Sequence, residues 1–462
     1  MAFNMDPKKC PMPSQEPNIR NKNFKEVALG YTYEMAVNEA KRCLHCKVPQ
    51  CKKACPIENN IPDFIHELSM GNMGEAMNVL HEKTNLPAIC GRVCPHEKQC
   101  EGHCVLGKKG RPVRIGKLES FIAQFDSDMQ LTHERIPEKT RGKVAVIGSG
   151  PAGLTVAGDL ARQGFHVTIF EGQPEAGGVL MYGIPEYRLP KAVVRNEIKK
   201  IEDLGVHFVR NCLVGTPESG VTVDSLFAEG FDAIFMGTGT ALPQNLSIPG
   251  ADLRRVTQST DFLHNVNAYV EGALPMEMVP LRKGDKVAVI GGGNVAMDAA
   301  RTARRLGADV TVIYRRTQAE MPAIQSEYED AVKEGVNFMW QTNSLEFLGN
   351  KKGRVCAIRL STPDGECTEP FDRVFLAIGS RPAARIVSTT TGIETDEKGY
   401  VIVGERPMGM TTRRGVFAGG DVVHRPQTVV LAMKAAKEVA LGIAQYVDAI
   451  KLLEDCGLKA EE

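Results

Sequence analysis

Short runs of consecutive apolar residues predict buried parallel strands at two places in the chain. Val144 to Ile147 form the first run, and a glycine turn, a helical stretch and a second run from Val167 to Phe170 follow without interruption. The same order begins again at Lys286, in KVAVIGGGNVAMDAARTARRLGADVTVIYRR. This internal repeat predicts two α/β dinucleotide-binding folds of the Rossmann type in one chain.

Three further apolar runs predict buried strands, one before the second unit and two from its end onwards, where the chain returns to the first fold. Phe231 to Gly239, Phe375 to Gly379 and Arg413 to Asp421 each end in small or polar residues, and a helical stretch from Val429 to Tyr446 follows the last of them. The second dinucleotide domain is therefore expected as an insertion in the first. The expected boundaries are 141–243 and 381–462 for the first domain and 244–380 for the second.

The first 140 residues show a different pattern. Residues 24–42, 61–80 and 115–125 carry apolar positions at helical spacing, and no alternating strand pattern lies between them. A small α-helical domain is expected at residues 1–140, in front of the two α/β domains.

Composition narrows the class of protein. The 462 residues suffice for about three domains, and 43% hydrophobic with 24% charged residues is typical of a globular protein. The formal net charge is zero, so no global field attracts nucleic acid. No apolar run reaches the roughly 18 residues of a membrane span, and the polar N-terminus lacks the apolar core of a signal peptide. A cytoplasmic protein without a nucleic-acid partner or a membrane span is predicted.

Eight of the thirteen cysteines lie between Cys43 and Cys104. In a cytoplasmic chain, cysteines gathered in this way are more often metal ligands than disulfides. Two groups of four, each containing a Cys-Pro step, are typical of iron–sulfur sites. Two structural zinc sites are the alternative, but zinc sites prefer paired C-x2-C knuckles and only one such knuckle is present. The two groups are Cys43, Cys46, Cys51 and Cys55, and Cys90, Cys94, Cys100 and Cys104.

The first glycine turn has the full context of a dinucleotide site. Gly148, Gly150 and Gly153 surround Pro151 and Ala152, and Glu171 lies eighteen residues after Gly153, where an acid can accept hydrogen bonds from a ribose. An empty α/β turn is the alternative. The glycine- and proline-rich segment from Ala176 to Lys191 predicts a binding loop near this turn. Further cofactor contacts are expected at Gly178, Val179, Gly239, Gly420, Asp421, Thr428 and Val429.

The second turn differs where the ribose-binding acid should lie. Tyr314 occupies the position that matches Glu171, and Arg315 and Arg316 follow it. Guanidinium groups at this point suit a 2′-phosphate, so the spacing favours NADP over NAD; a solvated arginine pair is the alternative. The turn itself is expected to bind through Gly291, Gly292, Gly293, Asn294 and Val295.

Five motifs resemble the small, NADPH-oxidising subunit of bacterial glutamate synthase and its relatives. They are AKRCLHC, CGRVCP, YGIPEYRLPK, GGGNVAMD and the closing AGGD. Two segments, MPSQEPNIRNKNFKEVALGY and QCEGHCVLGKKGRPVRIGKLE, are most similar to the large subunit of NADH-dependent ferredoxin:NADP oxidoreductase, an electron-bifurcating enzyme. The resemblance implies FAD in the first dinucleotide domain, NADP(H) in the second and two 4Fe-4S clusters in the helical domain.

The resemblance also implies particular ligands. One cluster would be held by Cys43, Cys46, Cys51 and Cys104. The other would be held by Cys55, Cys94, Cys100 and Glu119, which leaves Cys90 outside both. Arg188 matches the family's loop, where it would stabilise negative charge at the reduced flavin; a purely structural arginine is the alternative.

The number of electrons that each cofactor transfers indicates their order. NADPH gives a hydride, which carries two electrons, whereas an iron–sulfur cluster takes one electron, so a flavin must transfer electrons between them. The chain has no segment for an amidotransferase, so a partner is implied. We expect a bifurcating subunit that works with ferredoxin, NAD and a separate flavin/iron–sulfur subunit. The alternatives are a glutamate synthase small subunit with its large subunit, and a non-catalytic scaffold.

Overall fold

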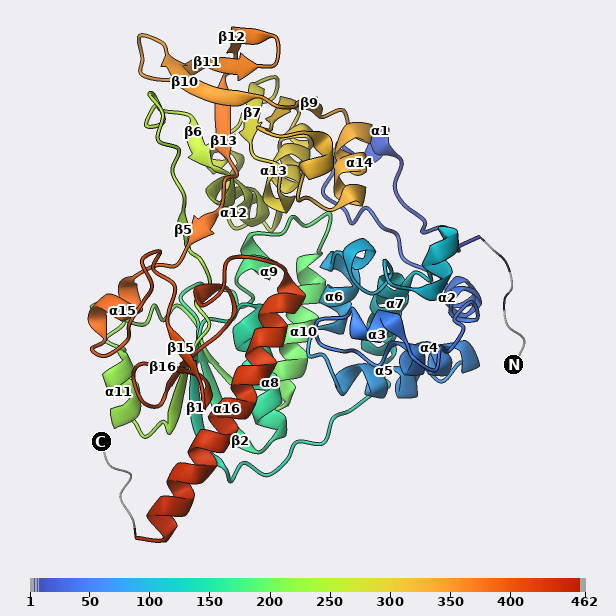
Figure 1. The fold of residues 1–462 in the computed structure, drawn as a ribbon, viewed down its shortest axis with the longest axis vertical. Helices are drawn as coiled ribbons and strands as arrows, with labels where there is room; N and C mark the ends of the chain where they lie inside the picture. The colour runs from blue at the N-terminus through green and yellow to red at the C-terminus, as the bar shows by residue number, and fades with distance from the viewer. Residues whose placement is uncertain (1–3, 5, 7, 458–462) are drawn as a thin grey trace.

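The computed structural model describes residues 4, 6 and 8–457, which form three connected parts (Figure 1). A helical part comes first, a larger parallel sheet lies at the centre, and a second parallel sheet lies above it. The expected fold class, a helical N-terminal domain before two Rossmann-like units, is confirmed.

The described residues of the helical part form seven α-helices and two short 3-10 helices. Residues 24–32 are not helical, contrary to the periodicity: the helix begins at Tyr33, where Thr32 Oγ1 accepts a hydrogen bond from Met35 N. Gly71, at φ +85°, divides the predicted 61–80 stretch into two helices. The elements are α1 (Pro17–Arg20), α2 (Tyr33–Ala40), α3 (Gln50–Lys53), α4 (Ile61–Met70), α5 (Met73–His81), α6 (Pro87–Val93), η1 (His96–Lys98), η2 (Val105–Lys109) and α7 (Ile115–Met129).

The first sheet has seven strands in the order β15-β16-β17-β4-β1-β2-β3, and all its neighbours are parallel except at β16. The strands are β1 (Gly142–Ile147), β2 (Phe165–Phe170), β3 (His207–Val209), β4 (Ala233–Met236), β15 (Val403–Glu405), β16 (Met408–Thr411) and β17 (Val416–Ala418). The helices of this part are α8 (Pro151–Arg162), α9 (Val179–Tyr182), α10 (Lys191–Asp203), α11 (Val223–Ala228), α15 (Arg385–Thr389), η5 (Gly420–Val422) and α16 (Val429–Asp455).

The second sheet has five parallel strands in the order β6-β13-β7-β8-β9. They are β6 (Val256–Gln258), β7 (Lys286–Ile290), β8 (Asp309–Ile313), β9 (Asn337–Met339) and β13 (Arg373–Leu376), with the helices α12 (Ser259–Val270), η3 (Met276–Met278), α13 (Asn294–Arg305), η4 (Gln318–Glu320) and α14 (Gln325–Lys333). A separate antiparallel sheet, which the sequence pattern did not predict, lies at the top of Figure 1. It consists of β10 (Asn343–Gly349), β11 (Val355–Thr362) and β12 (Gly365–Pro370).

Two connections join the two sheets. The outgoing one contains β5 (Leu242–Pro243) and the returning one contains β14 (Ser380–Arg381), and these two short strands pair antiparallel. Because the chain leaves and re-enters at one place, the second unit is an insertion in the first. The domain boundaries expected from the sequence fall beside these strands, and they stay a prediction.

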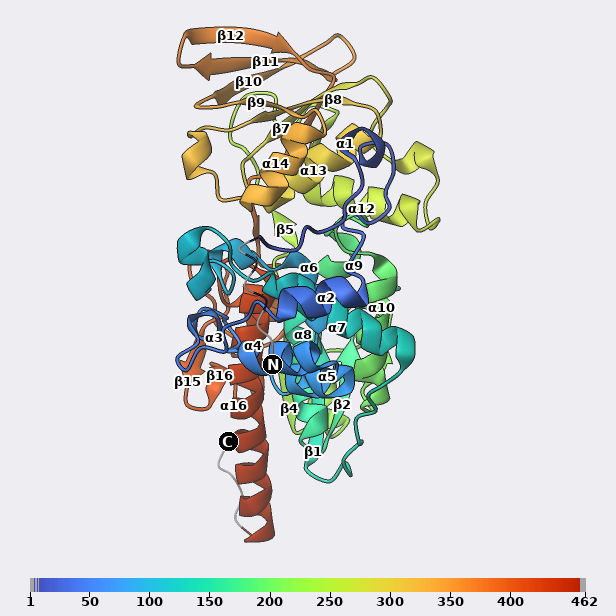
Figure 2. The same ribbon diagram turned by 90° about the vertical axis from the view of Figure 1, so that its right-hand side faces the viewer.

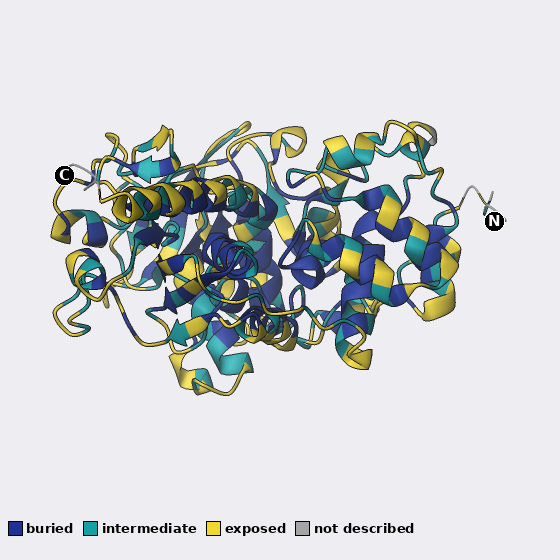
Figure 3. Ribbon diagram, turned by 90° about the horizontal axis from the view of Figure 1, so that it is seen from below, coloured by how far each residue is buried: buried dark blue, intermediate teal, exposed yellow. Residues whose placement is uncertain are grey.

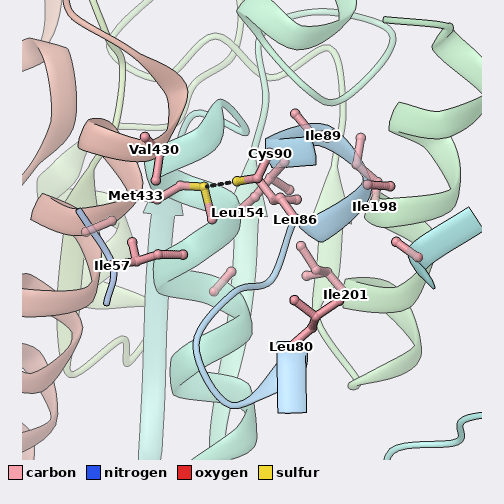
Figure 4. Close-up of a cluster of buried hydrophobic side chains, with 14 of the residues drawn as sticks. Ile57, Leu80, Leu86, Ile89, Cys90, Leu154, Ile198, Ile201, Val430 and Met433 are labelled. Atoms are coloured by element: carbon pink, nitrogen blue, oxygen red, sulfur yellow. Dashed lines mark hydrogen bonds between the residues drawn. The ribbon is translucent and has the colours of Figure 1, made fainter. Parts of the chain in front are cut away.

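One hydrophobic core joins the helical part to the first sheet. Leu86 and Ile89 of the helical part, Leu154 of α8, Ile198 of α10 and Met433 of α16 belong to the same buried cluster (Figure 4). Seen from below, buried residues lie in the interior of both parts (Figure 3). The helical part is therefore fixed against the elements that form the first glycine turn.

α16 is the longest helix, and its far end extends beyond the rest of the molecule (Figure 2). Neither it nor any other helix in the described part of the chain combines the length and apolar character that crossing a membrane requires.

Candidate active site

The first glycine turn connects β1 to α8 at the carboxyl edge of the first sheet. Gly148 has φ +97°, and a Cβ there would lie 2.8 Å from Gly237 O; a Cβ on Gly153 would lie 1.9 Å from Gly148 O. A Cβ on Gly150 would contact nothing within 4 Å. Two glycines therefore allow the tight turn, and the third faces open space before the N-terminus of α8, where a pyrophosphate fits.

Glu171 supports this turn through Ser149, a residue that the sequence reasoning missed. Its carboxylate accepts hydrogen bonds from Ser149 N at 3.0 Å, from Ser149 Oγ, and from Gln173 N at 2.8 Å. Ser149 Oγ in turn accepts a hydrogen bond from Gly177 N at 2.9 Å. The acid thus joins the glycine turn to the predicted binding loop, and its contact to a ribose stays a prediction.

Two further predicted residues, Gly178 and Gly420, lie against the first turn. A Cβ on Gly178 would lie 3.0 Å from the Cα of Gly150, and a Cβ on Gly420 would lie 2.8 Å from the Cβ of Ala152. Val179, the first residue of α9, follows in the loop and is 52% exposed. The loop and the strand end therefore approach the turn closely, with little room for a side chain at Gly178 or Gly420.

The start of α16 has a polar atom without a partner. Thr428 Oγ1, in the residue before Val429, is buried and has no hydrogen-bond partner among the described residues, and burial raises the pKa of Asp421 to about 6. Gly239 follows β4 with φ +63°, and a Cβ there would meet nothing within 4 Å. The hydroxyl of Thr428, the half-buried carboxyl of Asp421 and the open backbone at Gly239 can all contact a bound dinucleotide.

The second glycine turn repeats the geometry of the first between β7 and α13. Gly291 has φ +137°, and a Cβ there would lie 2.3 Å from Ala377 O, while a Cβ on Gly292 would meet the ring of Tyr314 at 2.6 Å. Gly293, before the N-terminus of α13, faces open space. Val295 is 41% exposed in the first turn of that helix. The side chain of Asn294 connects the start of α13 to the residue before α14, because its Oδ1 accepts a hydrogen bond from Ile324 N at 2.9 Å.

Arg315 and Arg316 follow β8 at the same edge of the second sheet. Both side chains are exposed, and neither makes an ion pair within the described residues. They are available for a phosphate beside the second turn. An arginine pair that only contacts solvent would be exposed in the same way, so the preference for NADP over NAD stays a prediction.

Four cysteines line one pocket in the helical part: Cys43, Cys46, Cys51 and Cys104. Burial raises the pKa of Cys43 to about 12 and that of Cys51 to about 11, so these thiols need a neighbouring cation to become thiolates. Among the described residues, no set of three or more Cys, His, Asp or Glu is grouped tightly enough for one metal ion. Four cysteines around one pocket are the donor set that an iron–sulfur cluster takes.

The second predicted ligand set also gathers in space. Burial raises the pKa of Cys55 and of Cys100, and the nearby carboxyl of Glu119 adds to both shifts; burial and then the carboxyl of Glu197 raise the pKa of Glu119 to about 8. Glu119 Oε1 accepts a hydrogen bond from Asn59 Nδ2 at 3.3 Å. Cys94 is half-buried beside this set, and the pKa of its thiol is raised first by a hydrogen bond with Cys90. These contacts fit a cluster, and the ligand assignment stays a prediction.

Cys90 lies between the second set and α16. Its Sγ is 3.6 Å from Sδ of Met433, one helical turn beyond Thr428 (Figure 4). The residue is only 2% exposed. The motif spacing left this cysteine without a role, and its place at the junction with α16 follows only from the packing.

Arg188 extends from the loop towards the second unit. Its Nη1 donates hydrogen bonds to both carboxylate oxygens of Asp298, each at 2.8 Å, and its Nε lies 3.2 Å from Glu327 Oε1. Asp298 belongs to α13 and Glu327 to α14. These ion pairs favour the structural alternative, in which Arg188 holds the two units together; its flavin role stays a prediction.

Comparison with known proteins agrees with this geometry. The family model described as dihydropyrimidine dehydrogenase domain II, 4Fe-4S cluster, matches residues 20–131. The model described as pyridine nucleotide-disulphide oxidoreductase matches residues 142–436. The chain belongs to the pyridine nucleotide-disulphide oxidoreductase family. It is an oxidoreductase with a 4Fe-4S domain in front, as the sequence predicted.

Relatives extend the similarity over nearly the whole chain. The glutamate synthase [NADPH] small chain of Halomonas elongata is 36% identical, and the match covers 96% of both chains. The NADP(+)-dependent formate dehydrogenase subunit beta of Moorella thermoacetica is 36% identical over 86% of this chain and 60% of its own. FprA of Mycobacterium tuberculosis, solved in complex with NADPH, shares the fold with a TM-score of 0.57 at 19% identity, over 70% of this chain and 87% of its own. The expected resemblance to glutamate synthase small subunits is confirmed.

Proposed function

We propose that this chain is the NADP(H)-binding subunit of a redox complex and that it passes electrons between NADPH, FAD and two 4Fe-4S clusters. The observation that carries the proposal is the shared core of the helical part and the first sheet, because it fixes both cysteine sets against the elements of the first glycine turn. Electron transfer needs such fixed distances between its centres.

The first turn is assigned to FAD. Gly148, Gly150 and the start of α8 would hold its pyrophosphate, and Thr428 Oγ1 and Asp421 would bind its polar groups. When bound, FAD supplies the conversion between a two-electron hydride and single electrons. The chain's own residues orient the dinucleotide and exclude water from it.

The second turn is assigned to NADP(H). Gly291 and Gly293 allow the pyrophosphate to approach α13, and Arg315 and Arg316 would pair with the 2′-phosphate. The pocket of Cys43, Cys46, Cys51 and Cys104 is assigned to one cluster. Cys55, Cys94, Cys100 and Glu119 are assigned to the other, which lies on the side of Cys90 and Met433.

The final acceptor is proposed from the resemblance of residues 12–31 and 99–119 to the bifurcating ferredoxin:NADP oxidoreductase. In this proposal ferredoxin exchanges single electrons with the clusters, and a separate flavin/iron–sulfur subunit handles NAD. The chain would act in the cytoplasm. Purification of the native complex tests this, since NADPH-dependent ferredoxin reduction that requires NAD supports it, and glutamine-dependent NADPH oxidation without ferredoxin reduction contradicts it.

A glutamate synthase small subunit is the second candidate, favoured by the 96% mutual coverage with the small chain of Halomonas elongata. In that case the native complex would contain a large amidotransferase subunit. Identification of the copurifying chain by mass spectrometry separates the two candidates. A chain that binds no FAD and shows no NADPH-driven bleaching would contradict both.

A further inference from the structure

Five arginine side chains line a pocket at the edge of the second sheet opposite to its glycine turn. The pocket has a volume of about 290 Å³, and its lining is Arg254, Arg255, Thr257, Pro280, Arg282, Arg354 and Arg373. Arg373 begins β13 and Arg255 precedes β6, so both lie at the amino ends of parallel strands. Gly291 and Arg315 follow the carboxyl ends of β7 and β8. The pocket is therefore separate from the candidate nucleotide site.

The positive charge of this pocket is almost unopposed. Arg373 pairs with the carboxylate of Asp285, which also accepts a hydrogen bond from Arg282 N at 2.9 Å. The other four guanidinium groups make no ion pair in the part of the chain that the structure describes. Five guanidinium groups against one carboxylate leave four positive charges around a concave space. On an ordinary protein surface, arginines are interspersed with carboxylates, whereas the lining of this pocket contains no carboxylate.

The backbone holds these arginines in place. Arg254 N donates to Gly353 O at 3.0 Å and Val355 N donates to Arg254 O at 3.0 Å, so Arg254 and Arg354 lie side by side on paired segments. Arg255 has φ +74°, a left-handed conformation that is uncommon for a residue with a side chain. Its carbonyl accepts a hydrogen bond from Val374 N at 3.0 Å. Like charges are thus kept together by strand pairing and by a strained residue, which is typical of a binding site.

We propose that this pocket binds a small polyanion that carries at least two phosphate groups. Guanidinium groups bind phosphate oxygens in pairs, and their planar forks suit several phosphate oxygens at once. Four unopposed charges match the three to four negative charges of a pyrophosphate or triphosphate group, whereas one phosphate would leave about half of them unopposed. The pocket is near the lower limit, about 300 Å³, of small-molecule sites, so it suits a compact ligand.

Titration calorimetry of the holoenzyme with inorganic tripolyphosphate tests the proposal. We expect one site per chain, and binding at least tenfold weaker in an Arg254→Gln/Arg354→Gln variant. Both side chains are at least partly exposed, so the variant should fold. Lys351→Gln/Lys352→Gln is the matched control, because these exposed lysines lie on the same turn outside the pocket. The control should bind as tightly as the parent chain.

Five results would overturn the proposal. Absence of tripolyphosphate binding would show that the pocket is not a site for it. Binding that is weakened as much in the lysine control as in the arginine variant would show only a diffuse surface charge. Loss of the site in Arg315→Gln/Arg316→Gln instead would assign the binding to the nucleotide turn. Orthophosphate of equal affinity would remove the requirement for two phosphates. A pocket covered by the partner subunit in the native complex would make it a protein interface.

Discussion

Replacement of Arg188 by methionine separates a structural role from a catalytic one. The guanidinium makes two 2.8 Å hydrogen bonds to Asp298 and an ion pair with Glu327, and its side chain is 9% exposed. Without it, the buried carboxylate of Asp298 loses its described ion-pair partner. Removal of one member of a buried pair costs about 3 to 5 kcal/mol. We expect the second unit to lose stability by about this amount.

Trp340 gives a direct assay, because it is the only tryptophan and lies in the second unit, stacked on Phe338. The free energy of unfolding falls by about 2 kcal/mol per M urea, so the expected loss lowers the urea midpoint of unfolding by about 1.5 to 2.5 M. The fluorescence of Trp340 reports this midpoint. Arg195→Leu is the matched control, because its side chain is 43% exposed and pairs across the same two units with Glu271. A surface pair of this kind contributes about 0 to 1 kcal/mol.

The rate of flavin reduction by NADPH completes the test. If Arg188 is structural, the rate at saturating NADPH should stay within about threefold of the parent value, since the flavin chemistry does not depend on this residue. An unchanged urea midpoint together with a rate at least tenfold lower would refute the structural reasoning and support the flavin role.

Two other changes test separate parts of the site, and a third tests the stability of the helical part. Arg315→Gln/Arg316→Gln should weaken NADPH binding relative to NADH by about 2 to 4 kcal/mol, because two charge-assisted bonds are lost; equal NADPH affinity would remove the 2′-phosphate assignment. Glu119→Ala should alter the spectrum and potential of one cluster and leave the other unchanged, as shown by electron paramagnetic resonance and iron content; two unaltered clusters would make Glu119 an ordinary helix carboxylate. Burial lowers the pKa of His81 to about 4, so the unfolded chain binds this proton more tightly and stability falls as pH drops below 6.5. Between pH 7.5 and pH 5 the loss is about 2 kcal/mol, and urea unfolding of His81→Gln should show a smaller pH dependence than that of the parent chain.

The local pattern of apolar residues and glycines predicts those structural elements whose residues all lie within a short stretch of the chain. The strand, turn and helix around Gly148 and Gly291 follow from apolar runs and glycine spacing, because each unit is completed within about 30 residues. The local pattern gives a wrong prediction where contacts with distant segments determine the backbone conformation. Residues 24–32 carry helical spacing, yet they are not helical, and Val27 N donates to the distant Tyr187 O. A tertiary contact has replaced the local preference there.

The sequence by itself determined the two dinucleotide folds, the insertion of one in the other and the metal-binding character of the first domain. Glycine turns and closely spaced cysteines involve residues that are near one another in the sequence, so their structural role can be predicted without the fold. Only the tertiary structure decided that Arg188 pairs with Asp298, that Cys90 meets Met433, and that arginines from Arg254 to Arg373 share one pocket. These groups are 110, 343 and 119 positions apart, and only the packing of distant segments brings them together.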